Sequence, residues 1–322
     1  MMEKLSEQIE QEIRSLVFPQ NLPNLFDPIS YTLNLRAKRI RPLLTLLGAR
    51  LFQPKAEIAM SQAIGVEIFH NFTLVHDDIM DEAPVRRGQA SVFKKWNSNT
   101  AILSGDVMFA MAVQHISNCN KEMLPEVLSC FLESTIKVCE GQQMDMDFEN
   151  RDRVELSEYM RMIELKTAWL LAGSLKIGAI VAGADKAASD RLFNFMMKAG
   201  TAFQLMDDYL DVFGDPSKFG KQVGGDIRSG KKTFLFLRSL ELCGDEDRKR
   251  LVEIYKAGTN RGEETVEEVA KIFSTCGAAK ELKLESEKLL NSGLEVLSRV
   301  KGDIEVMDEI VNLTHQLIIR EK

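Results

Sequence analysis

Cysteine is scarce in this sequence, and its spacing excludes several kinds of site. The chain has 322 residues but only five cysteines, an odd number. No two of them lie close enough in sequence to suggest a metal or redox pair. We therefore expect reduced thiols and a cytoplasmic protein.

The sequence also lacks a long hydrophobic run and an excess of positive charge. Its most apolar stretch, residues 169–184, contains Lys176 and is too short and too polar to span a bilayer. The N-terminal residues show no basic start followed by an apolar run, so we expect no signal peptide. A formal net charge of −7 disfavours general binding to nucleic acid. We thus expect no nucleic-acid partner and no stable membrane insertion, while an anionic ligand needs only a local group of cations.

Alternating strand patterns are rare, whereas apolar residues recur three and four positions apart through most of the chain. Leu5, Ile9 and Ile13 form one such stripe, and Pro42 suits the first turn of a helix that continues in leucines. No long linker, low-complexity tract or repeat interrupts this pattern. The sequence therefore predicts an all-α protein, a single large helical bundle over residues 1–322. Its expected helices include 57–80, 101–117, 122–145, 155–182, 188–213, 231–243, 246–257, 263–274, 277–299 and 303–320.

Two aspartate triplets share the spacing DDxxD, and each lies in apolar sequence. Their members are Asp77, Asp78, Asp81, Asp207, Asp208 and Asp211. Residues four apart on a helix share a face, so each triplet should present its carboxylates together. Half-buried carboxylates repel one another, and hard divalent cations with oxygen ligands offset that repulsion. Because Mg²⁺ recruits phosphate oxygens, the sequence predicts a diphosphate held by Mg²⁺ between the two acidic faces.

With these motifs the sequence resembles the trans-isoprenyl diphosphate synthases, the family of farnesyl and geranylgeranyl diphosphate synthases. The motifs follow in order over most of the chain. The resemblance implies the isoprenoid synthase fold with a central active-site cavity, several Mg²⁺ ions held by the six aspartates, and a homodimer. It implies condensation of isopentenyl diphosphate with an allylic diphosphate (dimethylallyl, geranyl or farnesyl) by ionisation, condensation and elimination. The implied product is farnesyl or geranylgeranyl diphosphate.

A diphosphate site also needs cations, and the sequence places several near the triplets. Lys38 and Arg41 match a family motif, Gly-Gly-Lys-x-x-Arg-Pro, in which Arg36 and Ala37 replace the two glycines. His70 lies two helical turns before the first triplet and so shares its face. The resemblance assigns the isopentenyl diphosphate to Lys38, Arg41, His70 and Arg87. It assigns the allylic diphosphate and the developing cation to Arg86, Lys166, Thr167, Gln204, Lys221 and Lys231.

Product length is implied by side-chain bulk just before the first triplet. Phe72 is bulky and Thr73 is small, a pattern that resembles short-chain enzymes. A helical wheel places Thr73, not Phe72, on the aspartate face, so the role of Phe72 rests on the resemblance. For His76 we expect a structural role.

Three alternatives remain open at this point. A metal-dependent phosphohydrolase would use His76 and Asp77 as a metal pair, but it leaves the second triplet and the paired arginines unexplained. A terpene cyclase typically carries a different second motif. A non-catalytic regulatory subunit would bind diphosphates without turnover.

Overall fold

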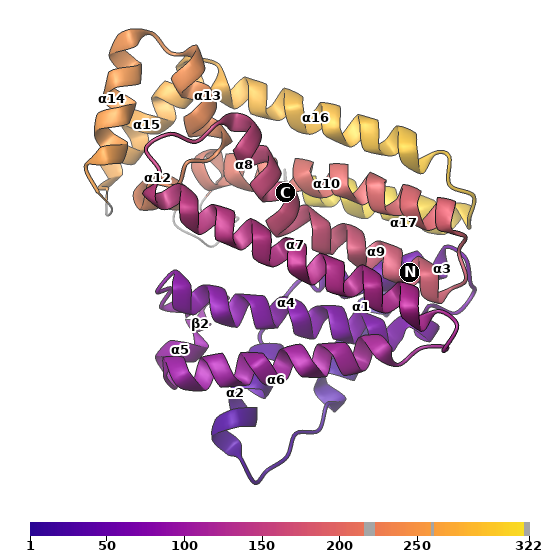
Figure 1. The fold of residues 1–322 in the computed structure, drawn as a ribbon. Coiled ribbons are helices and arrows are strands. Elements are labelled where there is room, and N and C mark those ends of the chain that lie inside the picture. Colours follow the sequence, from indigo (N-terminus) through magenta and orange to yellow (C-terminus); the bar gives the residue numbers. More distant parts are fainter. Residues whose placement is uncertain (216–222, 259–260, 319–322) are drawn as a thin grey trace. The chain divides into compact units, whose positions relative to one another are not determined.

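The computed structural model describes residues 1–215, 223–258 and 261–318, and it is built almost entirely from helices (Figure 1). This confirms the all-α prediction. The chain divides into two compact units. Unit 1 comprises Met1–Glu133, Gly173–Asp190 and Lys301–Ile310, and unit 2 comprises Ser134–Ala172, Arg191–Val300 and Val311–Lys322. The predicted single domain stays a prediction.

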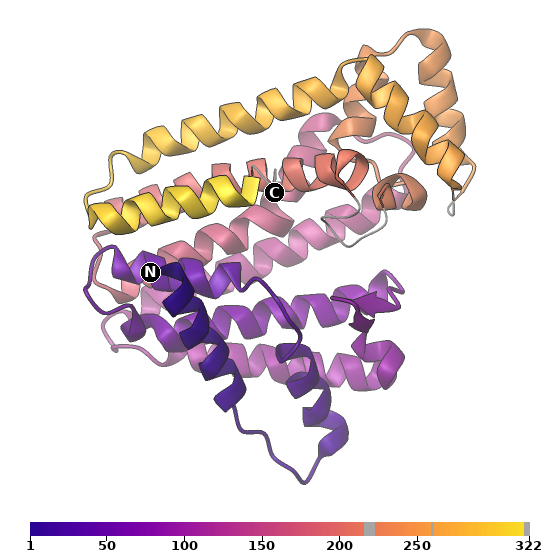
Figure 2. The same cartoon turned by 180° about the vertical axis from the view of Figure 1, so that it is seen from behind.

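Unit 1 is built around a pair of long helices that lie side by side in both views (Figures 1 and 2). These are α4 (Met60–Met80) and α6 (Ser98–Ser117). Gly65 of α4 lets the backbones approach, because a Cβ there would meet the carbonyl oxygen of Ala112 at 3.0 Å. Around this pair lie α1 (Met2–Ser15), α2 (Pro23–Leu33), α3 (Ile40–Arg50), the 3₁₀ turn η1 (Ala56–Ala59), the hairpin strands β1 (Val85–Arg86) and β2 (Gln89–Ala90), and α5 (Val92–Lys95).

Unit 2 buries a second apolar core, whose largest members include Phe148, Tyr159, Phe234 and Phe273. A group of three helices near residue 250 packs together and appears in orange in Figure 1. The elements of this unit are α8 (Leu156–Ile163), the π-helical turn η2 (Glu164–Ala168), α12 (Gly225–Ser229), α13 (Phe234–Leu242), α14 (Asp245–Lys256), α15 (Glu263–Thr275) and α16 (Ala278–Leu297). Four further helices contribute residues to both units, namely α7 (Leu124–Asn150), α9 (Trp169–Val181), α10 (Lys186–Phe213) and α17 (Ile304–Ile318).

The observed helices follow the apolar periodicity of the sequence closely. Leu5, Ile9 and Ile13 are the buried residues of α1, as their spacing predicts. The two aspartate triplets lie at the C-terminal ends of α4 and α10, with Asp81 directly after the last residue of α4. The sequence did not predict α2 or the β1–β2 hairpin, because both are short and rich in turn residues. None of the helices in the described ranges combines the length and the apolar character needed to cross a membrane.

Candidate functional site

Unit 1 contains a cavity of about 300 Å³ whose walls carry several of the predicted cations. The loop between α2 and α3 and the first residues of α3 supply one wall, α4 supplies another, and the hairpin adds Arg87. We call it the arginine-lined cavity. Its lining residues are Arg36, Ala37, Lys38, Arg39, Ile40, Arg41, Glu67, His70 and Arg87. The structure thus brings together all four residues that the resemblance assigns to isopentenyl diphosphate.

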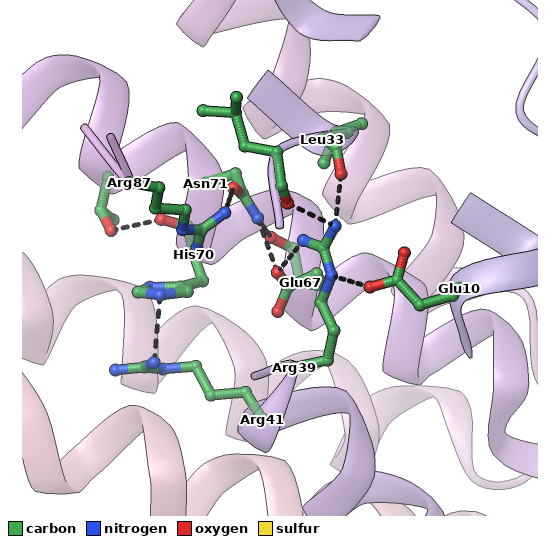
Figure 3. A network of polar contacts seen from close by, with 10 residues as sticks. Glu10, Leu33, Arg39, Arg41, Glu67, His70, Asn71 and Arg87 are labelled. Carbon is green, nitrogen blue, oxygen red and sulfur yellow. Dashed lines mark hydrogen bonds and ion pairs between the residues drawn. The ribbon is translucent and has the colours of Figure 1, made fainter. Parts of the chain in front are cut away.

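Arg41 and His70 meet directly in this cavity, where Arg41 Nη1 donates to His70 Nε2 over 3.1 Å (Figure 3). Burial, with neighbouring Arg41 and Arg87, holds the pKa of His70 well below its usual value, so the imidazole is a neutral acceptor. Burial, together with Arg87, lowers the pKa of Arg41 to about 10 although Glu67 opposes the shift. The buried Arg41 Nε has no hydrogen-bond partner within the described residues. A buried guanidinium with an unsatisfied N–H suits an anionic ligand.

Arg39, by contrast, is already neutralised by the protein. Arg39 is 4% exposed, and its side chain donates to Glu10 Oε1 over 2.8 Å and to Glu67 Oε1 over 2.7 Å (Figure 3). It also donates to the carbonyl oxygens of Leu33, the last residue of α2, and of Leu35 in the loop that follows. Arg39 therefore fixes the loop between α2 and α3 rather than offering its charge to a ligand.

The replacement of two family glycines does not strain that loop. Among the described residues other than glycine, only Arg39, Glu82 and Arg87 have positive φ. Arg36 and Ala37 consequently adopt backbone conformations that any residue tolerates. Because Arg36 also lines the cavity, the substitution adds a guanidinium where glycine would add no charge.

The members of the first triplet differ in exposure. Asp78 is 2% exposed, and Arg86 donates to its Oδ1 through Nε at 2.9 Å and Nη2 at 2.5 Å. Burial raises the pKa of Asp78, although Arg86 opposes the shift. Asp77 is half-buried and Asp81 is exposed. The two outer carboxylates are thus more accessible than the middle one.

Arg87 occupies the tip of the hairpin that follows the first triplet. The strands pair with Arg86 opposite Gln89, which leaves Arg87 and Gly88 as a two-residue turn. Both have positive φ, 53° and 76° respectively, as the tight turns favoured in hairpins require. Arg87 Nη1 donates to Asn71 Oδ1 over 3.1 Å (Figure 3). The hairpin and α4 together hold this arginine at the cavity.

An aromatic group surrounds the predicted chain-length position. The ring centroid of Phe72 lies 4.7 Å from that of His76, 5.6 Å from Phe69 and 5.8 Å from Phe109 on α6. The Thr73 hydroxyl forms a hydrogen bond within its own helix, because its Oγ1 donates to the His70 carbonyl over 2.8 Å. His76 Nε2 lies 3.1 Å from the Ile102 carbonyl oxygen. The Phe72 ring therefore packs against three other aromatic rings.

In unit 2 the members of the second triplet differ in exposure, as those of the first triplet do. Asp208 is 5% exposed, and its two carboxylate oxygens accept hydrogen bonds from Tyr159 and, over 2.9 Å, from Gln204. Thr167 Oγ1 in turn donates to Gln204 Oε1 over 3.0 Å. Burial and the nearby Asp226 raise the pKa of Asp208. Asp207 is exposed and Asp211 is half-buried.

Lys166 and Thr167 lie in the π-helical turn η2, a local widening that is common at functional sites. Lys166 Nζ forms an ion pair of 2.6 Å with Asp145 of α7. Gly141, one turn earlier on α7, faces the backbone of Lys166 so closely that any Cβ would overlap it. Asp145 is thus the anionic partner of Lys166 in this structure.

The first residues of α12 contact Asp211 of the second triplet. The backbone N–H of Asp226 donates to Asp211 Oδ2 over 2.9 Å, at the start of α12. Burial, with Asp211 beside it, raises the pKa of Asp226 to about 7. Lys231 is half-buried, and its backbone N–H donates to the Asp226 carbonyl over 2.9 Å. Lys221 lies outside the described residues.

Several residues of these networks were absent from the sequence-based assignment. Tyr159, Glu67 and Asn71 are buried polar residues, and each contacts a predicted site residue or its neighbour. The helical spacing of Glu67 and Asn71 offered a signal, because they lie one turn apart and precede the first triplet on the same helix.

Each triplet belongs to one unit, Asp77 to unit 1 and Asp207 to unit 2. The sharing of one diphosphate by both triplets stays a prediction.

Comparison with known proteins gives a consistent result over most of the chain. Residues 22–274 match the model of the family described as polyprenyl synthetase. A short chain isoprenyl diphosphate synthase from Methanothermobacter thermautotrophicus is 38% identical over 301 residues, 92% of either chain. A geranylgeranyl pyrophosphate synthase from Geoglobus acetivorans is 35% identical over 321 residues, 97% of this chain and 96% of the relative. The crystal structure of a geranylgeranyl pyrophosphate synthase superposes with a TM-score of 0.94 at 40% identity, covering 100% of this chain and 99% of the other.

Proposed function

Since this chain belongs to the polyprenyl synthetase family and is a prenyltransferase that elongates isoprenyl diphosphates, we propose that its arginine-lined cavity binds isopentenyl diphosphate. The observation that carries this assignment is the Arg41–His70 pair. A buried arginine bonded to a neutral imidazole, with Arg87 nearby, leaves positive charge that a diphosphate would neutralise. Lys38 and Arg36 at the cavity rim supply further cations.

The allylic diphosphate would be bound through the aspartates, with Mg²⁺ between carboxylate and phosphate oxygens. Oxygen donors fit this ion, because Mg²⁺ keeps several waters and needs only one or two carboxylates beside the phosphate. Within the described residues, no three or more His, Cys, Asp or Glu side chains are grouped so that they could hold a metal by themselves. We assign Mg²⁺ ions to the exposed or half-buried members of each triplet, Asp77 and Asp81 in unit 1 and Asp207 and Asp211 in unit 2, and assign supporting contacts to Asp78 and Asp208.

When bound, Mg²⁺ would supply positive charge to the leaving diphosphate. The protein's own cations, Arg86, Lys166, Lys231 and Lys221, would neutralise the same charge as the C–O bond breaks. Thr167 and Gln204 would direct their oxygen dipoles at the developing allylic cation. The double bond of isopentenyl diphosphate then attacks that cation, and the released diphosphate removes the proton. The alternatives are disfavoured, because a phosphohydrolase or a regulatory subunit leaves the likeness to named synthases unexplained.

Product length, assembly and location extend this proposal. Phe72, supported by Phe109, would stop the growing chain at farnesyl or geranylgeranyl diphosphate. A homodimer would cover the apolar residues Ile102 and Leu103, which are 45% and 56% exposed on α6. All five cysteines are free thiols, which suits a reducing cytoplasmic compartment.

The assignment is tested by incubating the protein with isopentenyl diphosphate and each allylic primer, followed by chromatography of the products. We expect chain elongation that chelation with EDTA abolishes and added Mg²⁺ restores. Asp77→Ala and Asp207→Ala should each remove nearly all turnover, because each loses a proposed carboxylate ligand. Asp308→Ala, on the exposed face of α17, is the matched control and should keep full activity. Near-normal turnover by either triplet variant at saturating Mg²⁺ would refute the metal assignment.

A further inference from the structure

Asn71 is a buried polar residue for which neither the motifs nor the proposed reaction supplies a role. Its side chain is 1% exposed and sits on α4, one residue after His70. Its Nδ2 donates to both the carbonyl oxygen and Oε1 of Glu67, each over 2.8 Å, and its Oδ1 accepts from Arg87 over 3.1 Å (Figure 3). The amide therefore links an anion on one side to a cavity arginine on the other.

Glu67 determines which way this amide points. Glu67 is 1% exposed, and its carboxylate is ion-paired with Arg39 over 2.7 Å. An ionised carboxylate only accepts hydrogen bonds, so Asn71 must turn its NH₂ group toward Glu67. The carbonyl oxygen of the Asn71 amide is then directed at Arg87. The order Arg39–Glu67–Asn71–Arg87 is a chain in which each member fixes the next (Figure 3).

The two arginines at the ends of this series of hydrogen bonds have partners of different charge. Arg39 is paired with two carboxylates, those of Glu10 and Glu67. Arg87 is held by a neutral amide oxygen, which orients the guanidinium and leaves its positive charge for a ligand. A carboxylate in the place of Asn71 would orient Arg87 equally well but would cancel that charge. The Asn71 amide thus orients Arg87 without neutralising it.

We propose that Asn71 is a positioning residue for isopentenyl diphosphate, which holds Arg87 in its binding orientation without neutralising it and is itself oriented by Glu67. This rests on the proposed binding of isopentenyl diphosphate in the arginine-lined cavity. The role is indirect, because Asn71 acts on the substrate through Arg87.

The test measures KM for isopentenyl diphosphate, KM for the allylic primer and kcat in the full-length protein. Asn71→Leu should raise KM for isopentenyl diphosphate about tenfold, the effect of losing a hydrogen bond to a charged group. The KM for the allylic primer and kcat should stay near wild type. Asn71→Asp should raise the same KM, because it keeps an acceptor for Arg87 but removes the donor to Glu67 and adds a cancelling charge. Should Asn71→Leu fail to fold, Asn71→Ala provides the same comparison.

A matched control lies on the same helix. Gln62 is also a fully buried amide of α4, but its Nε2 donates to the carbonyl oxygens of Ile116 and Asn118, away from the cavity. Gln62→Met should lower thermal stability without separating the two KM values. A purely structural role for Asn71 would give that same pattern in Asn71→Leu, and would overturn the proposal.

A double-mutant cycle decides whether Asn71 acts through Arg87. In an Arg87→Gln background, Asn71→Leu should have no further effect on KM for isopentenyl diphosphate, because its target is gone. An equal increase in both backgrounds, or equal increases for both substrates, contradicts the proposal. These outcomes differ from failure of the proposed function, in which the wild-type protein itself would not turn over isopentenyl diphosphate.

Discussion

Within each aspartate triplet the three carboxylates have different environments, although their sequence spacing is identical. The middle residues, Asp78 and Asp208, are buried and accept hydrogen bonds from Arg86 or from Tyr159 and Gln204. The outer residues face more solvent. A helical pattern predicts that the carboxylates share a face. It does not predict which of them will accept hydrogen bonds from the surrounding side chains.

At the residue scale, the raised pKa of Asp226 predicts a pH dependence. The pKa is about 7 in the folded protein and 3.8 in its ordinary state, so the folded state binds more protons between these values. The stabilising contribution of the Asp226 carboxyl is fully present below its ordinary pKa of 3.8. It is lost as pH rises through the folded-state pKa of about 7. Without metal, Asp226→Asn should therefore raise Tm by roughly 3 °C near pH 8 and by less near pH 5.

That comparison is made by calorimetry in EDTA, with Asp308→Asn as an exposed control. An equal gain in Tm at both pH values would show that the pKa of Asp226 is not raised. His70 has the opposite effect on the pH dependence of stability. Because its pKa is lowered in the folded protein, the folded state loses stability as pH falls below the ordinary pKa of histidine.

At the scale of elements, the functional side chains come from irregularities in otherwise regular helices. Lys166 and Thr167 project from a π-helical turn, and Arg87 from a hairpin with two positive φ angles. The sequence predicted helix throughout residues 155–182, and the structure divides it into α8, η2 and α9. A single widened turn leaves the apolar periodicity almost unchanged, so spacing alone does not reveal it.

The packing of α4 against α6 gives a prediction about product length. Phe72 is braced by Phe109, so removing either ring should deepen the space available to the product, and removing both should deepen it further. We expect Phe72→Ala to lengthen the product by at least one isoprene unit and the double variant with Phe109→Ala to lengthen it more.

Chromatography of the dephosphorylated products measures this length. Phe93→Ala on α5, outside the aromatic group of Phe69, Phe72, His76 and Phe109, is the control and should leave product length unchanged. Identical products from Phe72→Ala and wild type would end the chain-length assignment.

At the scale of the whole molecule, the chain forms two compact units, each with its own polar network. The arginine-lined cavity and first triplet belong to unit 1, while the second triplet and Lys166 belong to unit 2. The polar contacts that orient each triplet come from residues of the same unit. Local order at either site therefore depends on the core of that unit.

The proposed homodimer is tested at this scale. Leu103→Glu places a charge on the exposed apolar pair of α6 and should shift the protein from dimer to monomer in light scattering. Ile304→Glu alters another exposed apolar residue of unit 1, 78% exposed, and should leave the dimer intact. A Leu103→Glu protein that remains dimeric would exclude this part of α6 from the interface.

The sequence by itself determined most of the helices, the candidate cations and the family, because helical periodicity and motif spacing are local properties. Only the tertiary structure decided which charges are neutralised and which remain for a ligand. Glu10, Arg39 and Glu67 come from three segments that meet through packing, and the orientation of Asn71 follows from that meeting. Hydrogen bonds between distant segments depend on how helices pack, which no spacing along the chain records.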